Sequence, residues 1–252
     1  AAKLAAQLRS KQLVSRIEAQ RLVNFCTTAD PIFLIGAVSV GFFQSPKLAP
    51  ILLISHYGAA VAVGLIMRYY GSGELPLAPA STPKNSGSLL HQALKAMHQA
   101  RMEDSAPAGR LLKRAISGAL EIILLLGGLV IFISVMLEML AVSGFMHYFH
   151  SIVETFLLWI HLPEGLTKPL VDGLFEVTIG AKAAAEATGI GAVYQVVAAC
   201  LIVSWGGLSV HAQIAGLISH TDLRYGPFLT ARFLHGLLSA ALAFFIWQQV
   251  ML

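Results

Sequence analysis

The sequence predicts an all-α, polytopic membrane protein. Of its 252 residues, 56% are hydrophobic and only 12% are charged, and the mean hydropathy is +0.73, whereas a soluble domain carries about 25% charged residues. The apolar residues are gathered in runs close to the roughly 20 residues that a helix needs to cross the hydrocarbon core. These observations exclude a soluble globular protein and place the chain in a cell membrane.

Several segments are candidates for the spans. Residues 144–162 carry three histidines and a glutamate among aromatic residues, which favours an interfacial or re-entrant helix but leaves a span open. Residues 89–103 are expected to form a short amphipathic helix at the membrane surface. The region 190–218 is long enough to span, but two adjacent glycines and several polar residues interrupt it. The predicted spans are residues 22–43, which are also interrupted, 48–70, 116–140 and 227–250.

Basic residues predict the orientation. They outnumber acidic residues in segment 1–21 and in the linker 71–115, so the positive-inside rule places both segments in the cytoplasm. The glycine, proline and serine content of residues 71–88 predicts a flexible segment. If residues 144–162 stay outside, position 165 is outside and position 222 is inside.

The two ends of the chain share a weak internal similarity. A Lys-bearing turn, an interrupted helix, a short polar loop and a span that begins with proline follow in the same order, and Pro50 and His56 match Pro227 and His235. If residues 144–162 do not cross, the second copy has inverted topology, as in many secondary transporters. We expect further N-terminal sequence of the first repeat before Ala-Ala-Lys. The expected domains are a first repeat at 1–70, a cytoplasmic linker at 71–115, connecting helices at 116–162 and a second repeat at 163–252.

The first candidate site is the interruption Thr27-Thr28-Ala29-Asp30-Pro31. Pro31 lacks a backbone N–H and disfavours helical geometry at Asp30. Because unpaired backbone groups inside a bilayer have to face protein or a water-filled cavity, Thr27, Thr28 and Asp30 are candidate substrate contacts. The alternative, compatible with the first, is that Asp30 caps a helix over 32–43.

The second candidate site is the interruption Trp205-Gly206-Gly207. Ser209 and Gln213 follow it at a spacing that puts both on one helix face, and they are candidate substrate contacts. The alternative is ordinary glycine-mediated helix packing with hydrogen bonds between helices.

The third candidate site is the segment 174–182, with Glu176, Thr178, Gly180 and Lys182. An acid among apolar residues of a membrane protein indicates a functional site. Gly180 is expected to allow a tight turn, so that the next helix presents free N–H groups to a substrate. Lys182 is expected to pair with Glu176 or to extend to the interface. The alternative is that Glu176 forms only an ion pair or a helix cap.

Several other polar residues are weaker candidates for a functional site. Arg232, Glu121 and Glu138 lie near span ends and are expected to extend to the interface. His56 and His235 are expected to form hydrogen bonds between helices.

The sequence contains no pattern typical of a metal site, a phosphate-binding loop or a nucleophile elbow. We therefore expect no metal, no cofactor and no enzymatic activity. Cys26 and Cys200 form no disulfide framework or ligand pattern. Since the basic residues describe topology, nucleic acid is not an expected partner.

Six stretches resemble the YlbJ family of sporulation integral membrane proteins. The likeness covers nearly the whole chain except the linker 71–115. The stretches are residues 2–8 (AKLAAQL), 17–25 (IEAQRLVNF), Asp30-Pro31, 36–43 (GAVSVGFF), 55–58 (SHYG) and 173–180 (GLFEVTIG).

This resemblance implies a membrane protein of a spore-forming bacterium that is needed for sporulation. The family belongs to a group with the nucleoside-recognition "Gate" domain, which is similar to parts of concentrative nucleoside transporters and of the ferrous iron transporter's membrane domain. In the nucleoside transporters a glutamate in a re-entrant hairpin contacts substrate, and Glu176 has a similar setting. The residues around Glu176 depart from the transporters' hairpin sequence, so nucleoside specificity does not carry over with it.

The leading hypothesis is a transporter-like protein that moves a small polar solute, for which a nucleoside-like molecule is one option. The alternatives are a non-transporting scaffold for assembly of the spore envelope and a gate subunit of a multi-component channel. The expected partners are membrane lipids and the solute; a second copy of the chain is a further option.

Overall fold

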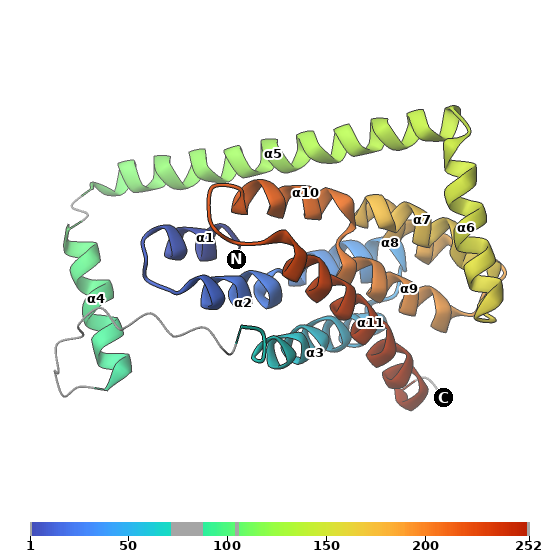
Figure 1. The fold of residues 1–252 in the computed structure, drawn as a ribbon, viewed down its shortest axis with the longest axis horizontal. Helices are drawn as coiled ribbons and strands as arrows, with labels where there is room; N and C mark the ends of the chain where they lie inside the picture. The colour runs from blue at the N-terminus through green and yellow to red at the C-terminus, as the bar shows by residue number, and fades with distance from the viewer. Residues whose placement is uncertain (1, 72–87, 104–105, 251–252) are drawn as a thin grey trace. The chain divides into compact units, whose positions relative to one another are not determined.

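The computed structural model describes residues 2–71, 88–103 and 106–250, and within them it is all-α (Figure 1). Residues 72–87, which include most of the segment predicted to be flexible, lie outside the described residues. The helices are α1 (Ala2–Ser10), α2 (Arg16–Cys26), the π-helix η1 (Phe33–Phe42), the 3-10 helix η2 (Pro46–Leu48), α3 (Ala49–Met67), α4 (Leu89–Glu103), α5 (Ala108–Val142), α6 (Phe145–Trp159), the 3-10 helix η3 (Glu164–Leu166), α7 (Thr167–Phe175), α8 (Val177–Glu186), α9 (Ala192–Trp205), α10 (Gly207–Ile218) and α11 (Tyr225–Val250).

The chain divides into two compact units. One comprises residues 1–75 and 132–252, and the other comprises residues 76–131. The second unit holds α4, which confirms the helix predicted over 89–103. Its apolar side chains Leu90, Leu94 and Met97 recur at helical spacing and are exposed. That α4 lies on a membrane surface stays a prediction.

Among the described residues, four helical segments are long and apolar enough to cross a membrane: Pro46–Met67, Ala108–Val142, Ala192–Ile218 and Tyr225–Val250. Three of them match predicted spans. The region 22–43 does not qualify as one helix, because α2 ends at Cys26 and the chain becomes helical again only at Pro31. The segment 192–218 qualifies in its place, although it is broken at Gly206.

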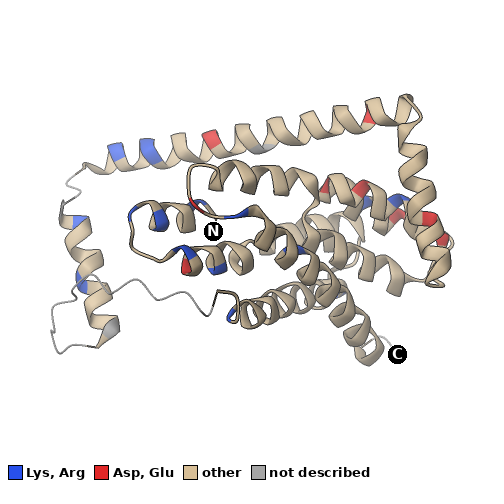
Figure 2. Ribbon diagram, in the orientation of Figure 1, with Lys and Arg blue, Asp and Glu red and all other residues tan. Residues whose placement is uncertain are grey.

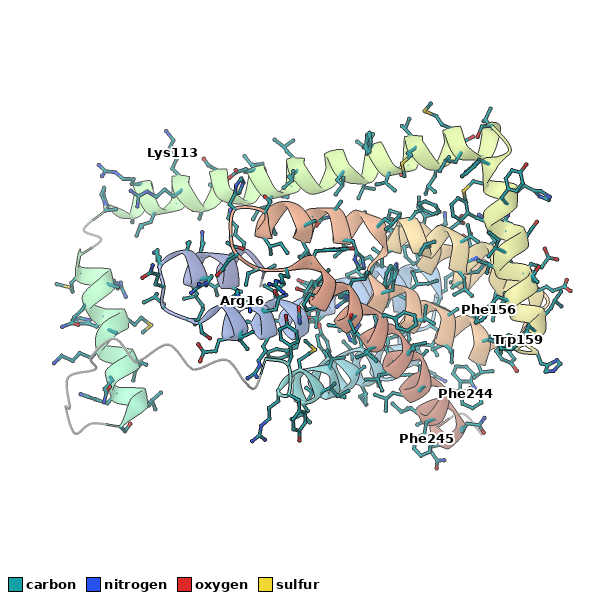
Figure 3. All side chains as sticks on the ribbon, in the orientation of Figure 1. Arg16, Lys113, Phe156, Trp159, Phe244 and Phe245 are labelled. Atoms are coloured by element: carbon teal, nitrogen blue, oxygen red, sulfur yellow. The ribbon has the colours of Figure 1, made fainter. Side chains whose placement is uncertain are left out.

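The core of the larger unit is built from α3, α9 and α11, which pack on one another, with α2 against α3 and α11. Helices α3, α9 and α10 contain no Lys, Arg, Asp or Glu, and α11 contains only Arg232 (Figure 2). Phe244 and Phe245 are exposed on α11, as are Phe156 and Trp159 on α6 (Figure 3). Exposed aromatic and apolar side chains on such helices are typical of a surface that faces lipid.

Helix α6 packs against α7 and η3 and runs across the end of the α7–α8 pair (Figure 1). Its 15 residues correspond to about 22 Å, against a hydrocarbon core about 30 Å thick. It is not among the segments long enough to span. Its position at the interface stays a prediction.

An ion pair joins α1 to the loop between α10 and α11. The Arg9 guanidinium donates to both carboxylate oxygens of Asp222, at 2.9 and 2.7 Å. These hydrogen bonds hold the pKa of Asp222 below its usual range and raise the pKa of Arg9. Nearby, the Arg224 amide donates to the Gln20 side chain at 2.7 Å. Two segments more than 200 residues apart in sequence are therefore tied at one end of the unit.

This ion pair predicts a pH dependence of stability. Because the folded pKa of Asp222 is lower than the unfolded one, the pair stabilises the fold above about pH 4 and is lost as the pH falls through the folded pKa. We expect Asp222→Asn to lower the free energy of unfolding by about 0.2–1 kcal/mol at neutral pH, the usual range for an exposed pair. In thermal unfolding, the difference from the unmodified protein should shrink as the pH falls below about 4 and vanish where the folded-state carboxyl is protonated. A difference that persists there contradicts the assignment.

Two exposed residues near the two ends of the broken span 192–218 allow its topology to be tested. Glu164 lies in η3, next to the segment that leads into α9, and His220 follows the end of α10; both residues are exposed. We expect a cysteine at 164 to react with an impermeant maleimide from outside intact cells, and a cysteine at 220 to react only after permeabilisation. Reaction of both from one side contradicts this topology. These positions replace 165 and 222, because a Cβ at Gly165 would lie 2.7 Å from Ile190 and Asp222 is ion-paired.

Candidate functional site

Helices α7 and α8 form a hairpin that turns at Glu176. Their 9 and 10 residues correspond to about 14 and 15 Å, so neither leg can cross the hydrocarbon core. The legs touch at Gly173 and Gly180, where a Cβ on Gly180 would lie 2.2 Å from the Gly173 Cα. The prediction of a turn at Gly180 is therefore wrong. The turn is at Glu176, which has an extended backbone (φ −139°), and Gly180 instead lets the two legs pack closely.

Glu176 is buried at the tip of the hairpin, with 1% of its surface exposed. Its carboxylate accepts a hydrogen bond from the Ile179 N–H at 2.8 Å and so caps α8. The predicted helix cap is therefore present, and contact of Glu176 with a substrate stays a prediction. The predicted pairing of Glu176 with Lys182 is wrong, because Lys182 is exposed and its Nζ lies 3.8 Å from Oε1 of Glu186. Thr178 is half-buried in the first turn of α8.

The predicted break in the second span is confirmed and contacts the hairpin tip. Gly206 and Gly207 have φ values of +91° and +68°, a region that glycine adopts without steric cost. A Cβ on Gly207 would lie 2.9 Å from the Phe175 carbonyl oxygen and 3.1 Å from the Glu176 Cα. The Trp205 indole also donates to the Leu174 carbonyl at 3.3 Å. The second and third predicted sites, at the Gly206-Gly207 break and at Glu176, therefore lie together.

Helix α10 continues from this break. Ser209 is buried and Gln213 is half-buried one turn further on, but no described contact brings either to Glu176. His211 of α10 links the end of α9 to the start of α11. Its Nε2 donates to the Trp205 carbonyl at 3.2 Å, and its Nδ1 accepts from the Tyr225 hydroxyl at 2.7 Å.

The predicted break in the first span is also confirmed. The Asp30 carboxylate accepts from the Ile32 N–H at 2.6 Å, so Asp30 caps the following helix, as its alternative role requires. That helix continues as the ten-residue π-helix η1, a conformation that is rare and often found at functional sites. Thr27 donates to the Val23 carbonyl at 2.7 Å. Thr28 is half-buried, whereas Asp30 is exposed.

Side chains satisfy the backbone groups of the first break. The Ala29 N–H donates to His56 Nε2 at 3.0 Å, and the Tyr57 hydroxyl donates to the Ala29 carbonyl at 2.8 Å. The Thr27 carbonyl accepts from Arg232. Polar backbone atoms inside a membrane need hydrogen-bond partners. Protein side chains supply these partners here, so the three backbone groups of Thr27 and Ala29 need no water.

Arg232 of α11 joins the two breaks. Only 2% of its surface is exposed, so the prediction that it extends to the interface is wrong. The guanidinium donates to the Thr27 carbonyl at the end of α2. It also donates to the carbonyls of Ser204 and Trp205 at the end of α9, the latter at 3.3 Å. No carboxylate of the described residues forms an ion pair with it.

Two histidines extend this network, as predicted for hydrogen bonds between helices. His235 Nδ1 faces the Arg232 guanidinium at 3.0 Å, so Nδ1 accepts, and Nε2 donates to the His56 carbonyl at 2.8 Å. His56 Nε2 accepts from Ala29, so its Nδ1 carries the proton and donates to the Ser204 hydroxyl at 2.8 Å. The partners determine both tautomers, with each ring neutral.

A cavity of about 530 Å³ lies along the hairpin, lined by residues of both legs. They include Ile179, whose amide holds the Glu176 carboxylate, and the Lys168–Asp172 ion pair at 2.6 Å. Lys182 also lines it. Charged groups therefore extend along the hairpin toward its buried tip. Within the described residues, no group of three or more His, Cys, Asp or Glu side chains is placed to hold a metal ion.

The residue that joins the breaks was not among the sequence candidates. Arg232 was set aside because it lies near the start of its span, and His56 and His235 because histidines commonly bond between helices. A signal was present, since a cation within an apolar span usually marks a functional position.

These features define the class: a polytopic α-helical integral membrane protein with two broken helices and a helical hairpin. The chain is 36% identical over 249 residues to the sporulation integral membrane protein YlbJ of Bacillus subtilis (strain 168), an alignment that covers 99% of the chain. The chain belongs to the YlbJ family. It spans 60% of the length of that relative. No protein-family model and no solved structure matches it.

The close contact within the hairpin predicts the effect of one methyl group. Gly180→Ala forces α7 and α8 apart, because its Cβ would overlap the Gly173 backbone; overpacking of this kind costs about 1–3 kcal/mol. Gly216→Ala is the matched control, since nothing lies within 4 Å of its Cβ position in α10. That control should be neutral or stabilising by up to about 1 kcal/mol. Thermal unfolding in detergent measures both, and equal effects would contradict the contact.

Proposed function

We propose that this chain forms the solute-handling part of a transporter-like membrane protein of sporulation, and that the solute is small and polar, with a nucleoside as the first candidate to test. The observation that carries the proposal is the meeting of a broken helix with the hairpin tip at Glu176. Discontinuous helices whose ends point at a common place are typical of the substrate sites of secondary transporters. The homologue's name describes a sporulation integral membrane protein and agrees with the membrane setting.

We further propose that the chain contains two related copies of inverted topology. The first is α1, α2, η1 and α3, and the second is α8, α9, α10 and α11. Contacts that come in matched pairs support this: α1 packs on α10 as α8 packs on η1, and α2 packs on α11 as α9 packs on α3. His56 and His235, at matched positions, face each other with ring centroids 4.7 Å apart.

Burial and charge support a solute site at the hairpin tip. Glu176 is an almost fully buried acid in a unit whose central helices lack charged residues other than Arg232. Such residues in membrane proteins mark solute or ion pathways. Ile179, whose N–H holds the carboxylate, is one of the residues that line the cavity along the hairpin.

Uptake into liposomes tests the proposal. We expect the purified protein to take up labelled uridine or adenosine, and Glu176→Gln to reduce uptake about tenfold or more because a hydrogen bond to a charged group is lost. Glutamine keeps an acceptor for the Ile179 N–H, so α8 remains capped. Glu138→Gln, which replaces an exposed acid of α5 that is not among the residues lining the hairpin cavity, is the control and should retain uptake.

Two outcomes would contradict the proposal. Full uptake by a folded Glu176→Gln protein removes Glu176 from the site. No uptake of nucleosides, amino acids, sugars or carboxylates by the unmodified protein favours the alternative of a non-transporting scaffold. That alternative also requires that neutral replacement of Asp30 and Glu176 leaves sporulation intact, whereas changes in the linker 71–115 abolish it. Co-purification with a nucleotide-hydrolysing partner instead favours a gate subunit of a multi-component channel.

A further inference from the structure

We propose that Arg232 is the positioning residue of this site: one guanidinium holds both helix breaks together, so that neither break rearranges without the other. The inference depends on the proposed function for its biological meaning, because it concerns the same breaks. The bracing itself can be measured without any solute.

The first step is to account for the carbonyl groups at the two helix ends. The last carbonyls of a helix have no partner within the helix. Here the Thr27 carbonyl follows α2, and the Ser204 and Trp205 carbonyls close α9. All three accept hydrogen bonds from Arg232. In an apolar bundle, the Thr27 and Ser204 carbonyls would otherwise be costly unpaired groups, whereas the Trp205 carbonyl also accepts from His211 Nε2.

The second step is electrostatic. The C-terminal end of a helix carries a partial negative charge, and two such ends converge on this guanidinium. No carboxylate of the described residues pairs with it. The two helix ends are therefore the principal groups that compensate a buried positive charge. Movement of either end away from Arg232 would leave that charge less compensated, which couples the positions of the two breaks.

The third step concerns the choice of arginine. Its planar guanidinium has five N–H donors in a rigid fork. The bonds to the three carbonyls and to His235 Nδ1 use both terminal nitrogens and Nε. A lysine ammonium keeps the charge, but it has three donors on one atom and cannot reach acceptors spread across a planar fork.

The fourth step links the guanidinium to α3. His235 joins Arg232 to the His56 carbonyl. His56 in turn binds Ala29 of the first break and Ser204 beside the second. The two breaks are thus connected by two routes, and Arg232 takes part in the more direct one.

Two native residues report on the breaks. Cys26 is the last residue of α2 and is half-buried, and Trp205 is the last residue of α9. In a Cys200→Ala background, reaction of Cys26 with a water-soluble maleimide measures water access to the first break. In a Trp159→Phe, Trp247→Phe background, the emission of Trp205 reports on the second break.

We expect Arg232→Lys to raise the rate of Cys26 labelling about tenfold or more and to shift Trp205 emission to longer wavelength, well below the melting temperature. Arg224→Lys, which replaces the other arginine next to α11, should change neither reporter. Leu157→Ala truncates a buried side chain of α6, which is not one of the broken helices, and controls for general destabilisation. It should lower the melting temperature while leaving both reporters as in the unmodified protein.

A folded Arg232→Lys protein in which one reporter changes alone, or neither changes, overturns the proposal. If this variant is not monodisperse, His235→Phe decides instead, because it keeps the guanidinium and replaces only one of its acceptors by an apolar ring. Both reporters should then shift in the same direction by a smaller amount. Two unchanged reporters in that variant also overturn the coupling. Because no solute is present, a negative uptake experiment leaves this result intact.

Discussion

The structure depends on one constraint: inside a bilayer, every backbone N–H and carbonyl needs a partner from the protein itself. Two helices of this chain are broken in the middle, and their open ends are satisfied by side chains rather than by further helix. Arg232 supplies donors to the ends of both α2 and α9, while His56 and Tyr57 bond the Ala29 amide and carbonyl. The breaks are possible because these partners are present.

The structure also depends on close backbone contacts between its helices. Gly173 and Gly180 allow the legs of the hairpin to touch, and Gly207 lets the hairpin tip rest on the break of the second span. Small residues at such crossings are typical of membrane helices, whose association relies on packing rather than on burial from water. The same contacts place Glu176 in a buried setting beside a break, with the charged groups of the hairpin cavity leading toward it. This arrangement is the physical basis for the proposed solute site.

Local chemistry accounts for what sequence reasoning predicted correctly. Apolar length located three of the four possible spans, because crossing the hydrocarbon core requires about 20 apolar residues wherever they occur. Asp30-Pro31 and Gly206-Gly207 predicted both breaks, since proline and glycine disfavour helix independently of their surroundings. Partners distant in sequence were predicted less well. Arg232 reaches the Thr27 carbonyl, and the hairpin tip rests on Gly207; both contacts depend on how the helices pack against one another.

The sequence by itself determined the membrane setting, the all-α class and the places where helices end, because these follow from hydropathy and from the intrinsic preferences of single residues. Only the tertiary structure decided that the two breaks meet, that a hairpin tip covers one of them, and that Arg232 turns inward instead of extending to the interface. Hydrophobic length says where a segment can cross, but it carries no information on which open carbonyl a distant guanidinium will reach. That choice is made when helices separated by up to about 200 residues in sequence pack together.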